Sequence, residues 1–340
     1  MTPDDLILRE ATLTDHDDIL NITKDEKLYG GRDYLPHWLR TWLEQGIDKQ
    51  SNRCNVVFLL ENQIVGYRML FFQNGGTVVV FNARRIPKNI RGKGFGRKIS
   101  ELTIEYLKSN YPNVTQRLSV IADLNLPDSE VFNSKHGELL TKKSVALYQV
   151  KFQEMTDLLA KYAASLPEPR NENQFLTEDE FKQVLRNEDF VNGALENETL
   201  LMKWDPILLK SVADINFARI GNFNFLLEGS TENPIALSVL TQPYPIADGQ
   251  LNLFFDFYTC KSDISRMSVV EHLNKHLVFF NKFNGEIENR VTIFEIFAFQ
   301  KDLQQVIQNM EKAGLGEKLY VCGKQNRKFQ NSYVYKKDLE

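Results

Sequence analysis

Short blocks of apolar and polar residues predict a mixed α/β unit over the first 150 residues. Alternating or continuous apolar runs indicate strands, and apolar residues at helical spacing indicate helices between them. A two-residue turn at Asn62-Gln63 separates two of the strands, and Thr14 with Asp17 has the pattern of a helix N-cap. The expected strands are residues 6–11, 55–61, 64–72, 77–86, 117–122 and 144–150; the expected helices are residues 12–24, the segment carrying Trp38, Leu39, Trp42 and Leu43, the segment from Gly96 to Asn110, and residues 128–136.

The second half of the chain repeats this order of elements without a detectable sequence repeat. A helix at residues 155–164 leads into a stretch with two prolines and polar neighbours, which is the best linker candidate. We therefore expect two tandem domains, residues 1–165 and 175–340, joined by a linker at 166–174. The expected elements of the second half are helices at residues 178–186, 269–281 and 302–312, and strands at residues 223–228, 235–240, 251–257, 291–298, 319–322 and 332–335.

The way the strands are connected indicates the fold class. In the first half, early strands follow one another through turns, as in antiparallel hairpins, and later strands alternate with helices, as in crossovers. This combination predicts an α/β (mixed α+β) fold, in which each domain has a mixed, mostly antiparallel sheet flanked by helices.

Composition and charge narrow the class of protein. The chain has 340 residues, of which 42% are hydrophobic and 25% charged, and its formal net charge is −4. These values favour globular domains over disorder and disfavour a nucleic-acid binder. With no signal-like start and no apolar run of membrane length, we expect a cytoplasmic protein with no membrane partner.

The cysteines and the paired histidines do not suggest a metal or disulfide site. Cys54, Cys260 and Cys322 are far apart and form no C-x-x-C pair. His272 and His276 stand four residues apart on an expected helix, but the residues between them do not match a zinc motif. We expect these two histidines to lie on a partly exposed helix face, and we expect no metal.

The segment from Arg84 to Lys98 carries the strongest chemical signal. It contains seven lysines and arginines and no acid, and it lies between an apolar strand and an amphipathic helix. Glycines let the backbone approach a ligand closely, and amides at a helix N-terminus bind anions. The spacing R-x-x-G-x-G is neither a P-loop nor a Rossmann fingerprint. The segment predicts a site for a phosphate or pyrophosphate, with a plain basic surface loop as the alternative.

This loop and the order of elements around it resemble the acetyl-CoA pyrophosphate loop and fold of the GNAT N-acetyltransferases. Residues 29–36 (YGGRDYLP), followed by Trp42-Leu43, resemble the YGGxDYLP…WL pattern of the histidine N-acetyltransferases and their relatives. Residues 241–246 (TQPYPI) and 255–257 (FDF) resemble two later segments of that family. The resemblance implies transfer of acetyl from acetyl-CoA to the α-amino group of a small amino acid such as histidine. It also implies a carboxy-terminal domain of the same fold without a cofactor site.

The resemblance assigns the cofactor site and leaves the proton-transfer groups open. The residues expected to bind acetyl-CoA are Arg84, Arg85, Ile86, Arg91, Gly92, Lys93, Gly94, Phe95, Gly96 and Arg97. Many GNAT enzymes carry a glutamate base late in the preceding strand, where this chain has Asn82. Many also carry a tyrosine acid after the next strand, where this chain has Phe132. Asn82, Asp33 and His37 are the remaining catalytic candidates, and weak activity is the alternative.

Five residues are candidates for binding the acceptor: Tyr29, Asp33, Tyr34, Tyr244 and Asp256. Asp33 suits an ammonium or imidazolium group, or it only shapes a turn. Tyr34 and Tyr244 line the pocket, or they only pack. Asp256 lies within an aromatic strand and needs a partner if buried, so a structural salt bridge is the alternative to a role in the cleft.

Three functions remain open at this point. The leading interpretation is an acetyl-CoA-dependent N-acetyltransferase that acts on a small-molecule amine, namely a free amino acid. An acyl-CoA-binding sensor with little catalysis fits the missing glutamate and tyrosine, and an acetyltransferase for protein N-termini or polyamines fits the same fold. We expect a monomer or a homodimer with no nucleic-acid partner.

Overall fold

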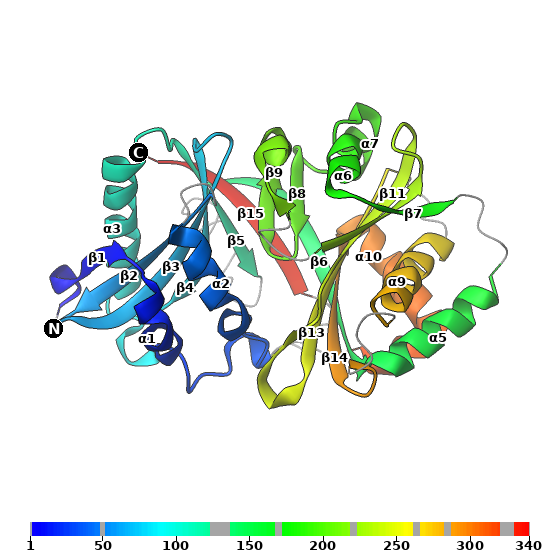
Figure 1. The fold of residues 1–340 in the computed structure, drawn as a ribbon, viewed down its shortest axis with the longest axis horizontal. Coiled ribbons are helices and arrows are strands. Elements are labelled where there is room, and N and C mark those ends of the chain that lie inside the picture. Colours follow the sequence, from blue (N-terminus) through cyan, green and yellow to red (C-terminus); the bar gives the residue numbers. More distant parts are fainter. Residues whose placement is uncertain are drawn as a thin grey trace. The chain divides into compact units, whose positions relative to one another are not determined.

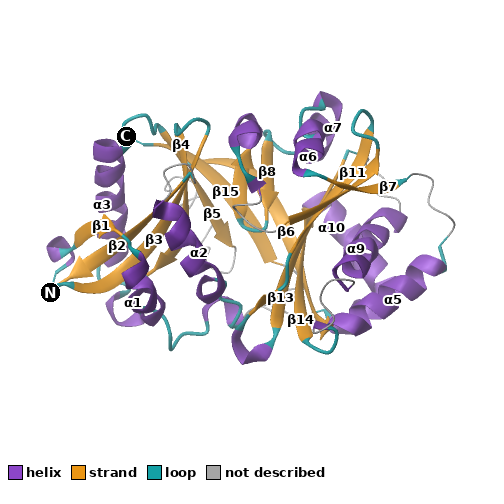
Figure 2. Ribbon diagram, viewed as in Figure 1, coloured by secondary structure: helices purple, strands orange, loops and turns teal. Residues whose placement is uncertain are grey.

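The computed structural model describes residues 2–47, 52–122, 137–166, 172–217, 223–260, 266–281, 287–319 and 330–339. Contacts divide the chain into two units, one built mainly from residues up to Val120 and the other mainly from Leu139–Val334. The last strand, β15 (Gln330–Asp338), contributes residues to both units. Figures 1 and 2 show the elements along the chain. The division at residues 166–174 that the linker suggests remains a prediction.

A mixed sheet forms the first unit. Strands β1 to β4 pair as antiparallel neighbours. β4 also pairs in parallel with β5, and the crossover helix α3 connects these two strands along the chain. The elements in chain order are β1 (Ile7–Glu10), α1 (His16–Asn21), α2 (Leu35–Ile47), β2 (Arg53–Leu60), β3 (Gln63–Gln73), β4 (Val78–Arg85), α3 (Phe95–Asn110) and β5 (Gln116–Ala122). Hairpins followed by a crossover are what the sequence predicts, and the α/β fold class is confirmed.

Side chains alternate between the two faces of this sheet, and each face has its own helices. Phe95, Ile99 and Leu107 of α3 pack on one face, against residues such as Phe58 and Leu70. Helices α1 and α2 contact β3 and β2 (Figure 1), and their buried residues include Leu39 and Leu43. The sheet therefore separates an α3 face from an α1–α2 face.

A β-bulge interrupts β4 near its end. Tyr67 is opposite Arg85 and Met69 is opposite Asn82, so two residues of β4, Ala83 and Arg84, oppose the single residue Arg68 of β3. Ala83 has φ of 52°, which is uncommon for a residue other than glycine and marks the bulged position. The parallel ladder with β5 covers Val78–Phe81 opposite Gln116–Ser119, and β4 continues beyond it to Arg85. The bulge and the end of this ladder thus coincide.

The second unit has a similar order of elements. Helices α5, α9 and α10 share a core with β6, β11, β13 and β14, and α7 contacts β13. The elements are β6 (Glu138–Lys151), α5 (Phe152–Ala164), β7 (Asn173–Leu176), α6 (Glu178–Val184), α7 (Glu188–Ala194), β8 (Thr199–Met202), β9 (Asp205–Leu208), β10 (Phe223–Gly229), β11 (Pro234–Thr241), β12 (Tyr244–Pro245), β13 (Leu251–Thr259), α9 (Arg266–Asn281), β14 (Val291–Phe299) and α10 (Gln300–Met310). The sequence prediction missed β7, α7, β8 and β9, which are short.

The strand of the second unit that corresponds in order to β4 is regular. β13 pairs with β11 in constant register from Ala236↔Thr259 to Leu240↔Phe255. Its parallel ladder with β14 runs unbroken from Leu251↔Thr292 to Asp256↔Phe297. In the described part of this unit, β13 therefore has no counterpart of the bulge in β4.

Three local predictions were wrong. The capping box before α1 uses Thr12 and Asp15 instead of Thr14 and Asp17, because Asp15 Oδ2 accepts the Thr12 amide at 2.7 Å. The turn between β2 and β3 is Glu61-Asn62, where φ is 50° and 65°, one residue earlier than expected.

The third wrong prediction concerns His272 and His276, which are fully buried instead of lying on an exposed helix face. Ser238 Oγ lies 2.7 Å from His272 Nδ1 and 2.9 Å from His276 Nε2. The strand hydroxyl thus bridges the two rings and makes them tolerable in the core.

No helix in the described ranges is both long and apolar enough to cross a membrane.

Candidate active site

The glycine loop leads from β4 into the N-terminus of α3. Gly92 has φ of 77° and Gly94, the N-cap of α3, has φ of 87°, so both positions favour glycine. A Cβ on Gly92 would meet no atom within 4 Å, so it would project into open space in front of the loop. The Arg97 and Lys98 amides donate to the Gly94 carbonyl, whereas the Phe95 and Gly96 amides come too early in α3 to have an acceptor four residues before them in the helix. The loop therefore has the backbone geometry of an anion cradle, and it fits the pyrophosphate of an acyl-CoA.

Cationic side chains surround this cradle. Arg91, Lys93 and Arg97 are exposed. Arg91 donates two hydrogen bonds to the Ile86 carbonyl, at 2.8 and 2.6 Å, and its guanidinium lies 2.6 Å from Glu26. Those contacts fix the start of the loop against the end of β4, while Lys93 and Arg97 extend the positive field. Phe95 anchors the first turn of α3 because its side chain is buried in the core.

The end of β4 presents residues to both faces of the sheet. Asn82 is opposite Met69 immediately before the bulge, and Arg84, the second residue of the bulge, is exposed. Gly96 in α3 lies close to this strand, since a Cβ there would be 3.5 Å from Ile86 Cδ1. The structure thus brings together Asn82, the strand and the loop that the sequence predicts as one site.

Arg85 joins this strand to the loop that precedes α2. Its side chain is 1% exposed, and Nη2 donates to Asp33 Oδ1 at 2.6 Å. Its guanidinium lies 5.6 Å from the ring centre of Tyr29 and 5.4 Å from that of Tyr34. Burial alone would lower the pKa of Arg85, but Tyr34, Tyr29 and Asp33 raise the pKa above its usual value. A residue expected to bind the cofactor and three expected to bind the acceptor therefore form one cluster, which we call the Arg85 cluster.

Backbone strain marks the loop that supplies this cluster. Tyr29, Gly30 and Gly31 have φ of 52°, 71° and 93°, three left-handed residues in a row. Tyr29 is a costly residue to hold there, and Arg32 Nε supports it by donating to the Tyr29 carbonyl at 2.9 Å. Tyr29 is nevertheless 47% exposed and stacks on Tyr34 with ring centres 5.8 Å apart. Exposure combined with strain is typical of a binding loop.

A buried polar chain holds α2 and its preceding loop on the sheet. Asn55 donates from Nδ2 to the Trp42 carbonyl at 2.7 Å and accepts the Tyr67 hydroxyl at 2.7 Å. A Cβ on Gly46 would lie 2.6 Å from Asn55 Nδ2, so only glycine allows this close approach. Tyr67 is directly opposite Arg85. The chain therefore links the position of α2 to that of the Arg85 cluster.

His37 lies in the first turn of α2 and is exposed, with its ring edge-on to Trp38 at 4.7 Å. Its backbone amide donates to the carbonyl of Tyr34, a member of the Arg85 cluster, at 3.1 Å. Phe132, the counterpart of the usual tyrosine acid, lies outside the described residues.

The two candidates from the second half of the chain are buried in the second unit. Asp256 Oδ1 accepts Lys143 Nζ at 3.0 Å and Oδ2 accepts the Lys203 amide at 2.9 Å. The structural salt bridge, which was the alternative for Asp256, describes these contacts. Tyr244 is 1% exposed, and its hydroxyl accepts Asn252 Nδ2 at 2.8 Å. Packing is likewise the arrangement that its contacts support.

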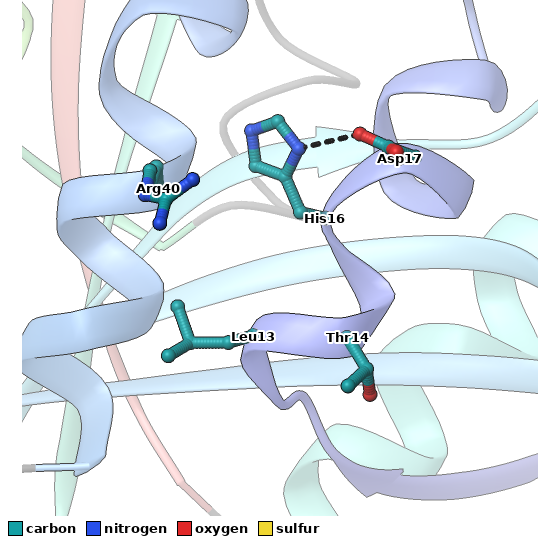
Figure 3. Close-up of a pocket in the computed structure, with 5 residues that line it drawn as sticks. All are labelled: Leu13, Thr14, His16, Asp17 and Arg40. Atoms are coloured by element: carbon teal, nitrogen blue, oxygen red, sulfur yellow. Dashed lines mark hydrogen bonds and ion pairs between the residues drawn. The ribbon is translucent and has the colours of Figure 1, made fainter.

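One shallow pocket of about 270 Å³ lies over α1 and α2. Figure 3 shows its lining residues Leu13, Thr14, His16, Asp17 and Arg40, none of which belongs to the predicted site. His16 Nδ1 is bonded to Asp17 at 2.7 Å, and Arg40 pairs with Glu44. The described residues also contain no group of histidine, cysteine or acidic side chains that could hold a metal.

The sequence prediction did not single out one buried charge beside the predicted site. Arg68 interrupts the apolar run of β3 directly opposite the bulge, and it is 3% exposed. A charged residue inside an apolar strand was the available signal, because a buried charge requires a specific partner.

Sequence comparison finds curated relatives along most of the chain. It is 26% identical over 278 residues to the histidine N-acetyltransferase of Oreochromis niloticus, a match that covers 78% of each chain. It is 24% identical over 286 residues to the histidine N-acetyltransferase of Scomber australasicus, again covering 78% of each. It is 24% identical to the human protein named probable N-acetyltransferase 16, covering 70% of this chain and 63% of that one. No protein-family model matches the chain.

Solved structures share the fold at low sequence identity. A tandem GNAT protein from the clavulanic acid biosynthesis pathway superposes with a TM-score of 0.60 at 11% identity, covering 98% of this chain and 99% of the other. The N-myristoyltransferase of Saccharomyces cerevisiae with bound myristoyl-CoA gives 0.55 at 9% identity, covering 98% and 82%. A GCN5-related N-acetyltransferase from Sphaerobacter thermophilus gives 0.54 at 10% identity, covering 100% and 98%.

The fold and the relatives together indicate a class of protein. The chain has the fold of the GNAT acyltransferases, and its sequence is similar to proteins named N-acetyltransferases. Within that class, its sequence is similar to the histidine N-acetyltransferases.

Proposed function

We propose that this acetyltransferase transfers acetyl to the α-amino group of a small free amino acid, with histidine as the leading acceptor. The observation that carries the proposal is the Arg85 cluster, in which the loop of residues 29–36 meets the end of β4 beside the glycine loop. Relatives that are similar to 78% of this chain are named histidine N-acetyltransferase.

Asp33 and the two tyrosines suit an amino acid that carries a positive charge. Both hydrogen bonds that the described residues give to Asp33, from Arg85 and from the Leu35 amide, end on Oδ1. The Asp33 side chain is 22% exposed, so Oδ2 can accept an ammonium or imidazolium proton. Tyr29 and Tyr34 supply aromatic faces that attract the same cation or stack on an imidazole ring.

The glycine loop and β4 are assigned to the donor. The amides of Gly92, Gly94 and Gly96, with Arg91, Lys93 and Arg97, hold the pyrophosphate. The strand from Arg84 to Ile86 runs alongside the pantetheine arm. When bound, acetyl-CoA supplies an activated acyl group, and amides at the bulge of β4 polarise its carbonyl as charge develops there.

The acceptor amine must lose a proton before it attacks. β4 carries Asn82 where a glutamate is common, and an amide side chain does not take up a proton at neutral pH. Asn82 therefore positions a water or the amine, and the proton leaves through solvent. This arrangement suits an amine with an ordinary or lowered pKa, and it predicts a rate that rises with pH.

The second unit is assigned no donor site. β13 keeps a regular register with β11. Its parallel ladder with β14 continues to Asp256↔Phe297, whereas the ladder of β4 with β5 ends at Phe81↔Ser119. Asp256 and Lys143 fill the corresponding stretch with a buried ion pair.

A sensor that binds acyl-CoA with little turnover is the second candidate, because Asn82 and Phe132 stand where a base and an acid are common. The two functions differ in one measurement. Purified protein is incubated with acetyl-CoA and each of twenty amino acids, and products are identified by mass spectrometry. The proposed function predicts an N-acetyl amino acid, and donor binding without any acetylated product would favour the sensor. Tyr29→Phe and Tyr34→Phe, which keep the rings, are the matched variants for the binding loop.

A further inference from the structure

Arg68 is a second buried arginine beside the proposed reaction centre. It lies on β3 opposite Ala83 and Arg84, the two residues that form the bulge in β4. Nη1 donates to Thr103 Oγ1 of α3 at 3.2 Å, so the side chain points to the α3 face. Its guanidinium lies 4.7 Å from the ring centre of Phe81, the last residue of β4 in the ladder with β5. Arg68 therefore occupies the place where β4 and β5 cease to pair.

The positive charge of Arg68 lacks a counterion among the described residues. Its Nε is buried without a hydrogen-bond acceptor, and no described carboxylate pairs with it. The charged neighbours that affect it are Arg84 and Arg117, both cations, and the Arg117 guanidinium lies 5.7 Å from the same Phe81 ring. Burial, followed by these two cations, lowers the pKa of Arg68 to about 9.

Arg85 shows what a balanced buried arginine looks like in the same sheet. Arg85 lies on β4 opposite Tyr67, and Tyr67 immediately precedes Arg68 on β3. Asp33 is the counterion of Arg85, at 2.6 Å. Burying a guanidinium without such a partner is costly, because the charge loses its hydration and gains no counterion in return. A ligand that brings an anion to Arg68 would supply the missing counterion and offset this cost.

We propose that Arg68 binds a carboxylate of a bound substrate at the point where β4 and β5 separate. Nε and the adjacent Nη2 form the edge of a guanidinium that accepts a carboxylate side-on through two hydrogen bonds. Arg84 and Arg117 add positive charge near the same position, and Phe81 excludes water from one side. The phosphates of the donor have their own site at the glycine loop, which leaves a carboxylate as the anion that fits here.

This inference rests on the proposed function and names a further feature of its substrates. A free amino acid carries a carboxylate one carbon away from the reacting amine, and that group is one source. The other source is the far end of a dicarboxylic acyl group in the donor. Both place a carboxylate near the reacting carbonyl, and the chemistry that Arg68 recognises is the same.

Two pairs of ligands distinguish these sources, and within each pair only one member carries the carboxylate in question. Histidine and histamine share the ring and a primary amine, and succinyl-CoA and acetyl-CoA share the coenzyme. Calorimetry measures the binding of all four ligands to the full chain, without any need for turnover. The variants are Arg68→Met, which removes the charge, and Arg68→Lys, which keeps a buried cation but loses the two-pronged edge. Thr103→Val is the matched control, because it removes the contact of Arg68 with α3 and the hydroxyl's own bond to the Ile99 carbonyl but leaves the charge of Arg68 in place.

We expect the wild-type protein to prefer the carboxylate member of at least one pair. Arg68→Met then weakens that member about 10-fold or more and its partner by less than about 3-fold, since charged hydrogen bonds are stronger than neutral ones. Arg68→Lys gives a smaller loss in the same direction, and Thr103→Val changes both members alike. The pair that responds identifies the source of the carboxylate.

Two results would overturn the proposal. One is a wild-type protein with no preference in either pair, and this result needs no variant to fold. The other is an equal loss for both members in Arg68→Met or Arg68→Lys, which would make Arg68 a packing residue. A wild-type protein that binds neither thioester contradicts the proposed function instead, while the histidine and histamine pair still decides the role of Arg68.

Discussion

Arg85 Nη2 lies 2.6 Å from Asp33 Oδ1, and this ion pair ties the end of β4 to the loop before α2. The arginine is buried and the aspartate is largely so, while Tyr29 and Tyr34 flank the guanidinium. A donor strand and an acceptor loop that are 52 positions apart in sequence thereby share one cluster. The position of the loop before α2 therefore depends on the Arg85 side chain at the end of β4.

Asp33→Asn removes the charge that balances Arg85 and should destabilise the first unit by about 2–3 kcal/mol, less than for a fully buried pair because Asp33 is partly exposed. Glu26→Gln breaks the pair with Arg91, whose side chain is 43% exposed, and should cost less than about 1 kcal/mol. Urea denaturation measures both free energies of unfolding. Equal losses in the two variants would contradict the importance given to the Arg85 cluster.

Gly92→Ala tests the anion cradle against backbone strain. Gly92 and Gly75 have φ of 77° and 60°, and a Cβ on either meets no atom within 4 Å. Each alanine should therefore cost about 1–2 kcal/mol of stability. Only Gly92→Ala places a methyl in front of the loop, so only this variant should raise the KM for acetyl-CoA, by several-fold. A similar rise in Gly75→Ala would show that strain alone explains the effect.

Asp256→Asn distinguishes a structural carboxylate from one that binds substrate. It leaves the Lys143 ammonium buried without its counterion, so the unfolding free energy should fall by about 3–5 kcal/mol. Replacing both partners, with Lys143→Met added, should recover part of that loss. We expect the KM for the acceptor to stay unchanged in the double variant. A raised KM in a stably folded double variant would restore Asp256 to the acceptor site.

The buried histidines predict how stability depends on pH. Burial lowers the pKa of His272 to about 3, with Lys275 adding to the effect, and burial and His272 lower the pKa of His276 well below its usual value. The unfolded chain titrates near pH 6.5, so it binds more protons than the folded chain below that pH. Stability should therefore fall as the pH drops from 6.5 toward 3, by up to about 1.4 kcal/mol per pH unit for each histidine.

Thermal unfolding of the wild type at pH 7.5 and 5.5 measures this dependence. The double variant His272→Gln/His276→Gln should lose most of the difference between the two melting temperatures. A wild-type protein whose melting temperature does not fall at pH 5.5 would contradict the buried neutral histidines.

The proposal of a donor site at the glycine loop could be made from local signals in the sequence. Its glycines, cations, preceding strand and following helix are contiguous, so their spacing alone indicates an anion site, and the order of elements indicates the fold class. The partner of Arg85 could not be predicted in this way, because Asp33 reaches it only through the folded sheet. His272 and His276 were placed on the wrong face for a similar reason, because their partner Ser238 on β11 meets α9 only in the folded chain.

Small local choices account for other differences. Thr12 and Thr14 both precede an acid by three positions, and only the backbone at the end of β1 selects Thr12 as the cap. The bulge in β4 could not be predicted from a glycine, because Ala83 itself takes the left-handed conformation there. Arg68 becomes significant only once that bulge is known to lie opposite it.

The central claim is that this chain acetylates a free amino acid at its α-amino group. The most direct measurement is release of coenzyme A thiol by the purified full chain, with acetyl-CoA and a panel of free amino acids that includes histidine. We predict turnover with histidine or a few related amino acids, and an N-acetyl product of matching mass. Thiol release that is the same with and without every amino acid would contradict the claim.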